Sequence, residues 1–440
     1  MTQVLNIIND LLWGAPLILL LLGTGLYFTF KLRNLKFFNF KLGVRYIFAK
    51  EARGSKGDIS SFAALCTALS ATLGTGNIVG VAVAISIGGP GVIFWLWVSS
   101  LLCFSIKYAE AFLAIKYRVT SSTDKVFGGP MYYLETGLKS KVLARLYALF
   151  GIFVAVFGIG TLAQGNSIVA ALESFGIPSI ATIIALGIIV ILVTIGGLER
   201  ISQVAKQIVP AMSLFYIGAA LIVLILRIDM IPHAFRSIFL GAFSPQAILG
   251  GGVGVSFINV IHIGVSRGIY AHESGLGSAA IASAAAKTNS PEQQGLIAMI
   301  GAFLTVVVCT MTGLVLLVNS DSIVLFNSSI SGSLLTPLAF DVGLRVPELG
   351  KCIVNISIVF FAFTTILGWN FYGERCTKYL LGDRWIIFYK FVFILALVTG
   401  PFLNIDIIFI IADIVIGLMT IPNIIGIIRL RKSIYLSNPT

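Results

Sequence analysis

Apolar runs of about 20 residues dominate this chain and constrain its fold more than any other feature. An α-helix of about 20 residues is long enough to cross the hydrocarbon core of a bilayer. A scan of the 440 residues predicts eleven such runs, at 10–30, 59–87, 91–115, 145–173, 178–197, 203–227, 248–284, 293–318, 350–373, 384–401 and 403–428. We therefore expect an all-α polytopic membrane protein with about 11 transmembrane helices.

The composition supports this class and excludes several others. Hydrophobic residues make up 58% of the chain and charged residues only 11%, whereas a soluble domain carries about 25% charged residues. A soluble enzyme, a nucleic-acid-binding protein and a disordered chain are therefore not expected. The five cysteines lie in apolar stretches without metal-binding spacing, so we predict neither disulfides nor a zinc site.

The positions of Lys and Arg predict the orientation of the spans. The loop after the first run, within 31–58, is rich in both residues and belongs in the cytoplasm under the positive-inside rule. If successive spans then cross the membrane in alternating directions, four basic residues of the loops lie outside: Arg227, Arg236, Arg345 and Lys351. The net charge of +12 thus follows from topology and needs no nucleic-acid partner. Because no Lys or Arg precedes the first run, we expect a retained helix, with the N-terminus outside and the C-terminus cytoplasmic.

Two runs are interrupted by glycine and polar residues. The run 59–87 carries Gly74, Gly76 and Gly80, and the run 248–284 carries Gly264, Gly268, Arg267, His272, Glu273, Gly275 and Gly277. Such backbone at membrane depth is tolerated where it faces protein or a wet cavity, although close helix packing through small residues is the alternative. The two runs are five spans apart and therefore enter the membrane from opposite sides. Interrupted spans at matching positions in the two halves of a chain indicate a transporter's binding site at the middle of the membrane.

This arrangement predicts four segments of the chain. Residues 1–58 would form an extra N-terminal span with a basic cytoplasmic loop, and 429–440 a cytoplasmic tail. Between them, 59–228 would form a first five-helix repeat, broken near 74–77, and 248–428 a second, inverted repeat, broken near 264–275.

A break at 74–77 would expose backbone groups of both signs. Amides at the start of the outer half-helix, with the positive end of its dipole, favour a carboxylate. Carbonyl oxygens near 70–73 suit a cation, and the hydroxyls of Thr364 and Thr365 in the ninth run would add two hard oxygen ligands. The alternative is that each threonine bonds back to its own helix.

Four more polar residues lie inside the runs and remain open to two interpretations each: Glu110, Gln164, Glu273 and Asp413. Glu273 either joins an ion pair, with Arg267 in reach only across an unwound stretch, or contacts substrate. Glu110, near the inner surface, is interpreted as forming a salt bridge either to Lys107 or to a nearby cytoplasmic basic residue. Asp413 has either a structural partner or a proton or cation role, and Gln164 either lines a cavity or ties helices together.

Five sequence blocks occur in a characteristic order over about 10–430: ALSATLGTGNIVGVAVAISIGGPGVIFWLWV, KYAEAFLAIKYR, GGPMYYLE, RGIYAHESGLGSA and FAFTTILGWNFYGERC. In these blocks the chain resembles the alanine or glycine:cation symporter family, also called sodium:alanine symporters. The resemblance implies a LeuT-like five-plus-five inverted-repeat fold of the amino acid–polyamine–cation type, with one extra N-terminal helix. It also implies sodium-coupled uptake of small neutral amino acids, chiefly alanine and glycine, across a bacterial or archaeal plasma membrane.

The resemblance also implies roles for individual residues. The substrate carboxylate would meet Gly74, Thr75, Gly76 and Asn77, and the amino group would meet the stretch with Tyr270, Ala271, Glu273, Ser274 and Gly275. The pocket would be lined by Gln164 and Trp369. Sodium would be held by Thr364 and Thr365 with the carbonyls of Ser70 and Leu73. The block Ala271-His272-Glu273-Ser274-Gly275 departs from the family's usual S-N-E-A-G, which leaves the substrate range and the coupling ion open.

Other functions compete with sodium-coupled uptake of alanine or glycine. A proton-coupled carrier would use Glu273 or Asp413, a symporter could prefer a larger amino acid such as glutamine, and an ion channel would line its pore with the glycine-rich breaks. The sequence holds no HExxH, CxxC, Walker or Ser-His-Asp pattern, so we expect no enzyme and no cofactor beyond the coupling ion. The expected partners are a zwitterionic amino acid, sodium and the lipid bilayer, and a monomer is compatible with the sequence.

Overall fold

The computed structural model describes residues 2–32, 37–49, 54–122, 124–243, 257–320, 332–403 and 405–436. Within them the chain is almost entirely helical. One antiparallel hairpin pairs β1 (Val119–Thr120) with β2 (Val126–Phe127). Eight helical segments are long and apolar enough to cross a membrane, or nine if the bent pair α4 and α5 is one span. The helical membrane class is confirmed, whereas the count of eleven crossings stays a prediction.

The helices up to residue 243 are α1 (Thr2–Leu12), α2 (Ala15–Lys31), α3 (Phe37–Ile47), α4 (Ser61–Thr72), α5 (Val79–Gly88), α6 (Val92–Lys116), α7 (Pro130–Tyr132), α8 (Lys141–Phe157), α9 (Leu162–Glu173), α10 (Ser179–Thr194), α11 (Gly197–Leu226) and α12 (Ile231–Phe243). They are followed by α13 (Phe257–His272), α14 (Ser278–Ala284), α15 (Pro291–Val318), α16 (Gly332–Leu344), α17 (Leu349–Leu381), α18 (Ile386–Thr399) and α19 (Ile405–Arg429). The predicted span 145–173 is divided into α8 and α9. Three connections predicted between other spans, at 31–58, 228–247 and 319–349, contain the short helices α3, α12 and α16.

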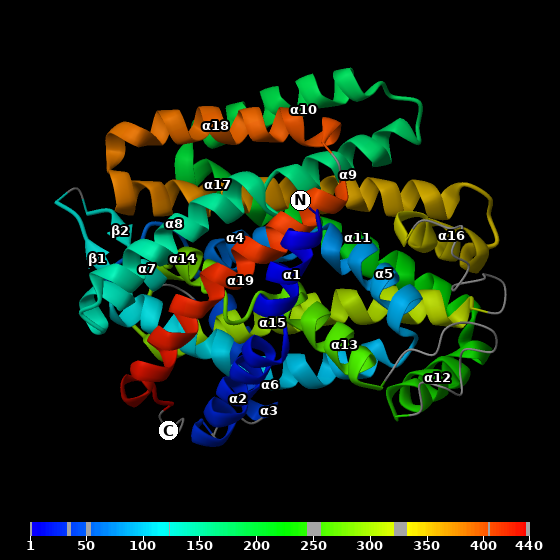
Figure 1. The fold of residues 1–440 in the computed structure, drawn as a ribbon, viewed down its shortest axis with the longest axis horizontal. Helices are drawn as coiled ribbons and strands as arrows, with labels where there is room; N and C mark the ends of the chain where they lie inside the picture. The colour runs from blue at the N-terminus through cyan, green and yellow to red at the C-terminus, as the bar shows by residue number, and fades with distance from the viewer. Residues whose placement is uncertain are drawn as a thin grey trace.

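The long helix α17 is central to the contacts that build the site. It packs against α4, α8, α9 and α11, and Figure 1 shows it running across most of the molecule. Helices α10 and α18 lie side by side along one edge (Figure 1). On the other side of the site, α6 packs against both α13 and α15. The first interrupted span is thus placed between α17 and the α6–α15 pair.

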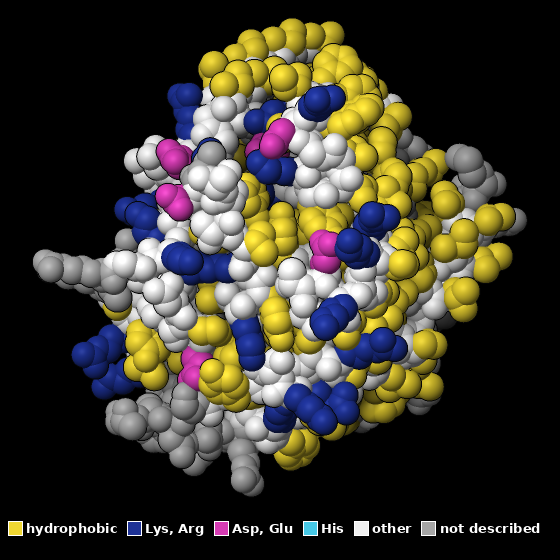
Figure 2. Space-filling model, turned by 90° about the vertical axis from the view of Figure 1, so that its left-hand side faces the viewer, with side chains coloured by type: hydrophobic (Ala, Val, Ile, Leu, Met, Phe, Trp, Pro, Cys, Tyr) yellow, Lys and Arg dark blue, Asp and Glu magenta, His cyan; other side chains and the backbone are white. Residues whose placement is uncertain are grey.

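Lys and Arg side chains gather at one end of the molecule. Figure 2 shows this end, with many basic and few acidic side chains. It is the end at which the β1–β2 hairpin and the C-terminus lie (Figure 1). Lys125, Lys139 and Lys141, in or next to elements at this end, are exposed. We refer to it as the basic end, and it agrees with the side that the positive-inside rule assigns to the cytoplasm.

The first interrupted span breaks at the residues where the glycine pattern predicts it. Helix α4 begins at a Ser60 cap, whose side chain accepts a hydrogen bond from the Ala63 amide (3.2 Å). It ends at Thr72, and a short 3-10 turn at Thr75–Asn77 leads into α5, with a bend of 68° between the two halves. The Asn77 side-chain amide donates to the Thr72 carbonyl (2.8 Å), so the end of α4 is partly closed by the turn itself.

The second interrupted span breaks later than the sequence predicts. Helix α13 continues to His272 and α14 begins at Ser278. Between them Glu273, Gly275 and Gly277 have φ values of 49°, 95° and 74°. This left-handed region suits glycine but costs an L-residue about 1–2 kcal/mol. The strained Glu273 therefore marks the start of the break.

Two glycines that were expected to unwind this span instead bring helices together. A Cβ on Gly264 would lie 2.6 Å from the Trp95 Cβ, and one on Gly268 would lie 2.2 Å from the Ser99 hydroxyl oxygen. Both glycines lie inside α13 and allow it to approach α6 closely. The predicted break near 264–275 is thus corrected to 273–277, because small residues at a helix interface also serve packing. Tyr270 and Ala271 are consequently helical.

Candidate functional site

Three elements meet at the first break. The Thr365 hydroxyl oxygen, on α17, lies 3.3 Å from the Leu73 carbonyl oxygen and 2.9 Å from its own helix carbonyl at Phe361. A Cβ on Gly74 would lie 2.9 Å from the Thr365 hydroxyl oxygen and 3.3 Å from the Gln164 side-chain nitrogen. Four of the residues expected at the site, from the first interrupted span, α9 and α17, are therefore neighbours.

Helix α17 approaches the last turn of α4 through Gly368. A Cβ there would lie 2.8 Å from both the Ala71 backbone nitrogen and the Ser70 hydroxyl oxygen. The last carbonyls of an α-helix lack partners within the helix, and Ser70 belongs to this turn. The Thr364 hydroxyl, by contrast, bonds the Phe361 carbonyl (3.1 Å) and lies 3.6 Å from the Met212 sulfur of α11. Its two contacts thus lie within α17 and on α11, and neither involves the break.

The backbone amides of the first break are only partly free. Within the 3-10 turn, the Asn77 amide donates to the Gly74 carbonyl (3.1 Å) and the Ile78 amide to the Thr75 carbonyl (3.2 Å). The amides of Thr75 and Gly76 begin the turn and take no part in its two bonds. Gly76 is exposed, and a Cβ there would meet nothing within 4 Å. The donors available to an anion are thus fewer than the sequence suggested.

Asn77 links the first break to α15. Its side-chain oxygen accepts a hydrogen bond from the Cys309 thiol (3.1 Å), and its backbone carbonyl accepts one from the Thr312 hydroxyl (3.0 Å). These two contacts and the bond to Thr72 stabilise the shape of the break through the side chain and the backbone carbonyl of Asn77. A substrate carboxylate beside this turn would therefore contact its backbone more than the Asn77 amide.

Glu110 supports the second break, a role that the sequence analysis did not assign. One of its carboxylate oxygens accepts hydrogen bonds from the amides of Gly275 (2.8 Å) and Gly277 (3.0 Å) and from the Asn423 side chain (2.8 Å). Asn423 also donates to the Gly275 carbonyl (2.7 Å). Glu110 is 1% exposed, and its predicted pairing with Lys107 is present at 4.0 Å.

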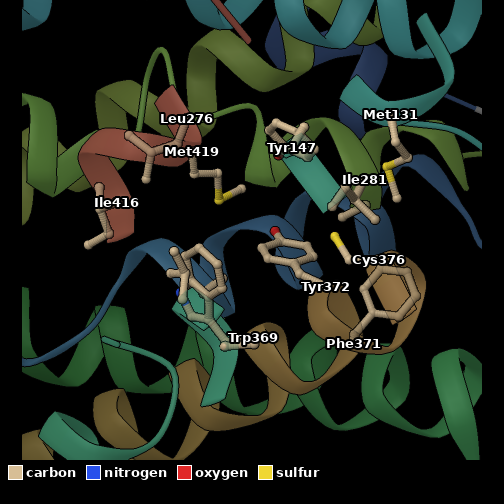
Figure 3. Packing of buried hydrophobic residues seen from close by; sticks show 14 of the residues in the cluster. Met131, Tyr147, Leu276, Ile281, Trp369, Phe371, Tyr372, Cys376, Ile416 and Met419 are labelled. Carbon is tan, nitrogen blue, oxygen red and sulfur yellow. The ribbon is translucent and has the colours of Figure 1, made fainter. Parts of the chain in front are cut away.

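The Glu273 carboxylate connects the second break to α17. It accepts a hydrogen bond from the Ser278 hydroxyl (2.6 Å) and faces the Trp369 indole. Trp369 is fully buried and meets Tyr372 edge to face, with ring centroids 5.5 Å apart. Figure 3 shows both rings leaving α17 on the same side. Thr365 and Trp369 lie one helical turn apart on the same face of α17. Thr365 lies at the first break and Trp369 beside the second.

Several buried polar atoms around the breaks lack a hydrogen-bond partner within the described part of the chain: Gln164 Oε1, His272 Nε2, Ser274 Oγ and Tyr372 OH. An unpaired buried polar atom costs about 1–3 kcal/mol, and most such atoms in proteins are satisfied. Their concentration around the two breaks is what a small polar ligand would satisfy.

Tyr270 and Arg267 lie in a different neighbourhood from Glu273. The Tyr270 ring stacks on Trp13, at a centroid distance of 4.8 Å, and both Tyr270 and Arg267 interact with Asp413. The Trp13 indole donates to the Asp413 carbonyl (2.8 Å). Arg267 therefore acts electrostatically on Asp413 of α19 and not on Glu273, and Trp13 brings the N-terminal helices to the edge of the site.

At the basic end of the molecule, polar contacts hold the two interrupted spans against their neighbours. Asp58, before α4, lies 3.7 Å from Arg375 of α17, with both side chains less than 15% exposed. Arg118 donates to the carbonyls of Ala284 (2.9 Å) and Ala286 (2.8 Å) at the end of α14. Burial lowers the pKa of the Arg118 guanidinium, and the nearby Asp58 carboxylate opposes this shift. The inner halves of both interrupted spans are thus held by charged residues.

Comparison with known proteins identifies relatives over nearly the whole chain. Residues 1–437 match the sodium:alanine symporter family. An uncharacterized transporter of Haemophilus influenzae is 49% identical, covering 98% of this chain and 94% of its own. The sodium/alanine symporter AgcS of Methanococcus maripaludis is 43% identical, over 97% and 94%, and the probable sodium/glutamine symporter GlnT of Bacillus subtilis is 35% identical, over 98% and 89%.

Solved structures show the same fold at low sequence identity. MhsT in complex with L-phenylalanine matches with a TM-score of 0.61 and 14% identity, over 84% of this chain and 89% of that one. A Na+-coupled sialic acid symporter in a substrate-bound outward-open state matches with a TM-score of 0.52 and 16% identity, over 97% and 83%. These matches confirm the LeuT-like fold. By its family match and its relatives, the chain belongs to the sodium:alanine symporter family of sodium-coupled amino-acid transporters and is not an enzyme.

Proposed function

We propose that this protein takes up small neutral amino acids, alanine and glycine, together with sodium. The observation that carries the proposal is the meeting of Thr365 with Leu73 and Gly74. This meeting places a hydroxyl oxygen beside the carbonyl end of a broken helix, and two such oxygens suit a group-one cation.

The substrate would lie between the two breaks. Its carboxylate would meet the amides of Thr75 and Gly76, and its ammonium group would meet the Glu273 carboxylate and nearby carbonyls of the second break. Trp369, wedged against the Cβ position of Gly160, would limit the length of the side chain. A methylene step in an apolar pocket changes binding by only about 1–3 kcal/mol, so selection for small substrates would be graded.

Coupling would follow from a shared preference of sodium and substrate for one arrangement. Sodium between Leu73 and Thr365 would hold the first interrupted span against α17, which also carries Trp369. The same contact shapes the pocket, so each ligand would favour binding of the other, and the coupling would be reciprocal. Alternating opening of the two ends would then move both ligands together, in a plasma membrane with the N-terminus outside and the basic end in the cytoplasm.

Uptake into liposomes containing the purified protein tests this proposal. We expect labelled alanine and glycine to accumulate when sodium is outside, and not when potassium replaces sodium at the same pH. Accumulation driven equally by a proton gradient in potassium would contradict sodium coupling. A panel that includes glutamine tests the substrate, because preferential accumulation of glutamine would replace alanine and glycine in the proposal. Passive flux without accumulation would indicate a channel.

A further inference from the structure

Three charged side chains lie buried together at the second break. Lys107, Glu110 and Glu273 are each no more than 3% exposed. The Lys107 ammonium donates to the Glu273 backbone carbonyl (3.0 Å) and lies 4.0 Å from a Glu110 carboxylate oxygen. Both carboxylates act on the ammonium electrostatically. The two carboxylates favour the charged form of the ammonium group, whereas its burial opposes that form.

The ammonium group lies between the ends of two half-helices. Lys107 and His272, the last residue of α13, line a small cavity together with Thr72, the last residue of α4. The C-terminal end of a helix carries partial negative charge and binds cations favourably. Lys107 therefore places a cation at the carbonyl end of α13, beside a cavity that the end of α4 also lines.

Among the residues that the structure describes, the other titratable groups near the cluster are neutral or have an oppositely charged neighbour. His272 accepts a hydrogen bond at its Nδ1 from the Ser274 amide (3.1 Å), so that nitrogen carries no proton and the ring is neutral. Arg267 and Asp413 balance each other on the other side of α13. With all three groups ionised, one ammonium group and two carboxylates give the second break a net charge of minus one.

This imbalance limits how many ions the loaded site can hold. A zwitterionic amino acid adds one charge of each sign, and one sodium ion then makes the whole site neutral. A second sodium ion would leave an uncompensated positive charge, and a bare buried charge costs several kcal/mol. We propose that Lys107 is a tethered second cation, so that one sodium ion moves with each amino acid. This inference rests on the proposed function, which it extends to the stoichiometry of coupling.

The limit of alanine accumulation in proteoliposomes measures this stoichiometry in the wild-type protein. With the membrane potential held at zero by valinomycin and equal potassium, an about tenfold sodium gradient supports about tenfold alanine accumulation with one sodium ion and about hundredfold with two. We expect about tenfold. A hundredfold limit would overturn the role of Lys107, whereas no sodium-driven accumulation would instead overturn the proposed function.

Variants of the cluster test the lysine itself. Lys107→Met leaves the site negative by one more charge, and we expect a second sodium ion to replace the ammonium, which raises the limit to about hundredfold. The double variant Lys107→Met with Glu110→Gln is balanced again and should return to about tenfold. The matched control is Lys390→Met, because Lys390 pairs with Glu374 (3.0 Å) away from both breaks, and it should keep the wild-type limit.

A measurement of sodium binding tests the role of Lys107 even if the Lys107→Met variant does not transport. Equilibrium binding of radioactive sodium to the purified protein with alanine present should show one site in the wild type and two in Lys107→Met. One site, or none, in the variant would contradict the inference, as would an unchanged accumulation limit in a transporting variant.

Discussion

The Thr365 hydroxyl oxygen lies 3.3 Å from the Leu73 carbonyl oxygen, at the point where α4 ends. This contact joins the long helix α17 to the inner half of the first interrupted span. The neighbouring Thr364 faces the Met212 sulfur of α11 instead. Two adjacent threonines therefore have different surroundings, and only Thr365 contacts a carbonyl of the break.

We expect Thr365→Val to weaken sodium binding selectively. The substitution keeps the volume and removes one oxygen ligand, at a cost of about 1–3 kcal/mol, so the KM for sodium should rise about tenfold. Sodium titrations of alanine uptake measure this change. Thr364→Val is the matched control and should have the smaller effect, and equal effects of the two substitutions would show that the hydroxyls act alike.

We expect alanine substitutions to separate Gly74 from Gly76. A methyl group on Gly74 would lie 2.9 Å from the Thr365 hydroxyl oxygen, whereas one on Gly76 would meet open space. Gly74→Ala should therefore impair uptake and Gly76→Ala should retain it. Gly76→Leu should abolish uptake while the protein still reaches the membrane, because the longer side chain crowds the exposed side of the break. Wild-type uptake by Gly76→Leu would remove this turn from the substrate path.

We expect the Lys107–Glu110 pair to be strongly coupled in stability. Loss of one partner of a buried ion pair costs about 3–5 kcal/mol, and Glu110 also accepts hydrogen bonds from Gly275 and Gly277. Glu110→Gln should therefore lower the melting temperature of the purified protein clearly. The double variant with Lys107→Met should be less destabilised than the sum of the two single variants. Additive losses would show that the two side chains act independently.

We expect Asp58→Asn to loosen the basic end. The partly buried pair with Arg375 should contribute about 1 kcal/mol or more. Its loss should speed maleimide labelling of the buried Cys66 in α4 about fivefold, measured in a Cys352→Ala background. Glu348→Gln removes the exposed pair with Lys351 (3.0 Å) and should leave labelling unchanged. An unchanged rate in Asp58→Asn would show that this pair does not hold the end closed.

The sequence predicts the first break well because its signal is local. Gly74 and Gly76 lie within a few residues of Asn77, which closes the end of α4 through its own side chain. The second break depends on tertiary contacts. Gly264 and Gly268 look like breaking residues but serve close packing against α6, a use that sequence spacing does not distinguish from unwinding.

Residues that join distant segments were the hardest to predict. Glu110 contacts Gly275, more than 160 positions away, and Asn423 on α19. Nothing near Glu110 in the sequence indicates these partners. The available signal was a Lys and a Glu three residues apart inside an apolar span, where charged residues are costly and usually functional. The family resemblance points to Thr365, Gln164 and Trp369, but the contrast between Thr365 and Thr364 emerges only from the packing of α17.

The most direct test of the account is the affinity of the purified protein for alanine, measured by calorimetry in sodium and in choline at the same ionic strength. If sodium holds α4 against α17, sodium should tighten alanine binding about tenfold or more, and alanine should tighten sodium binding by the same factor. Equal affinity for alanine in the two salts would contradict a site shared through Leu73 and Thr365.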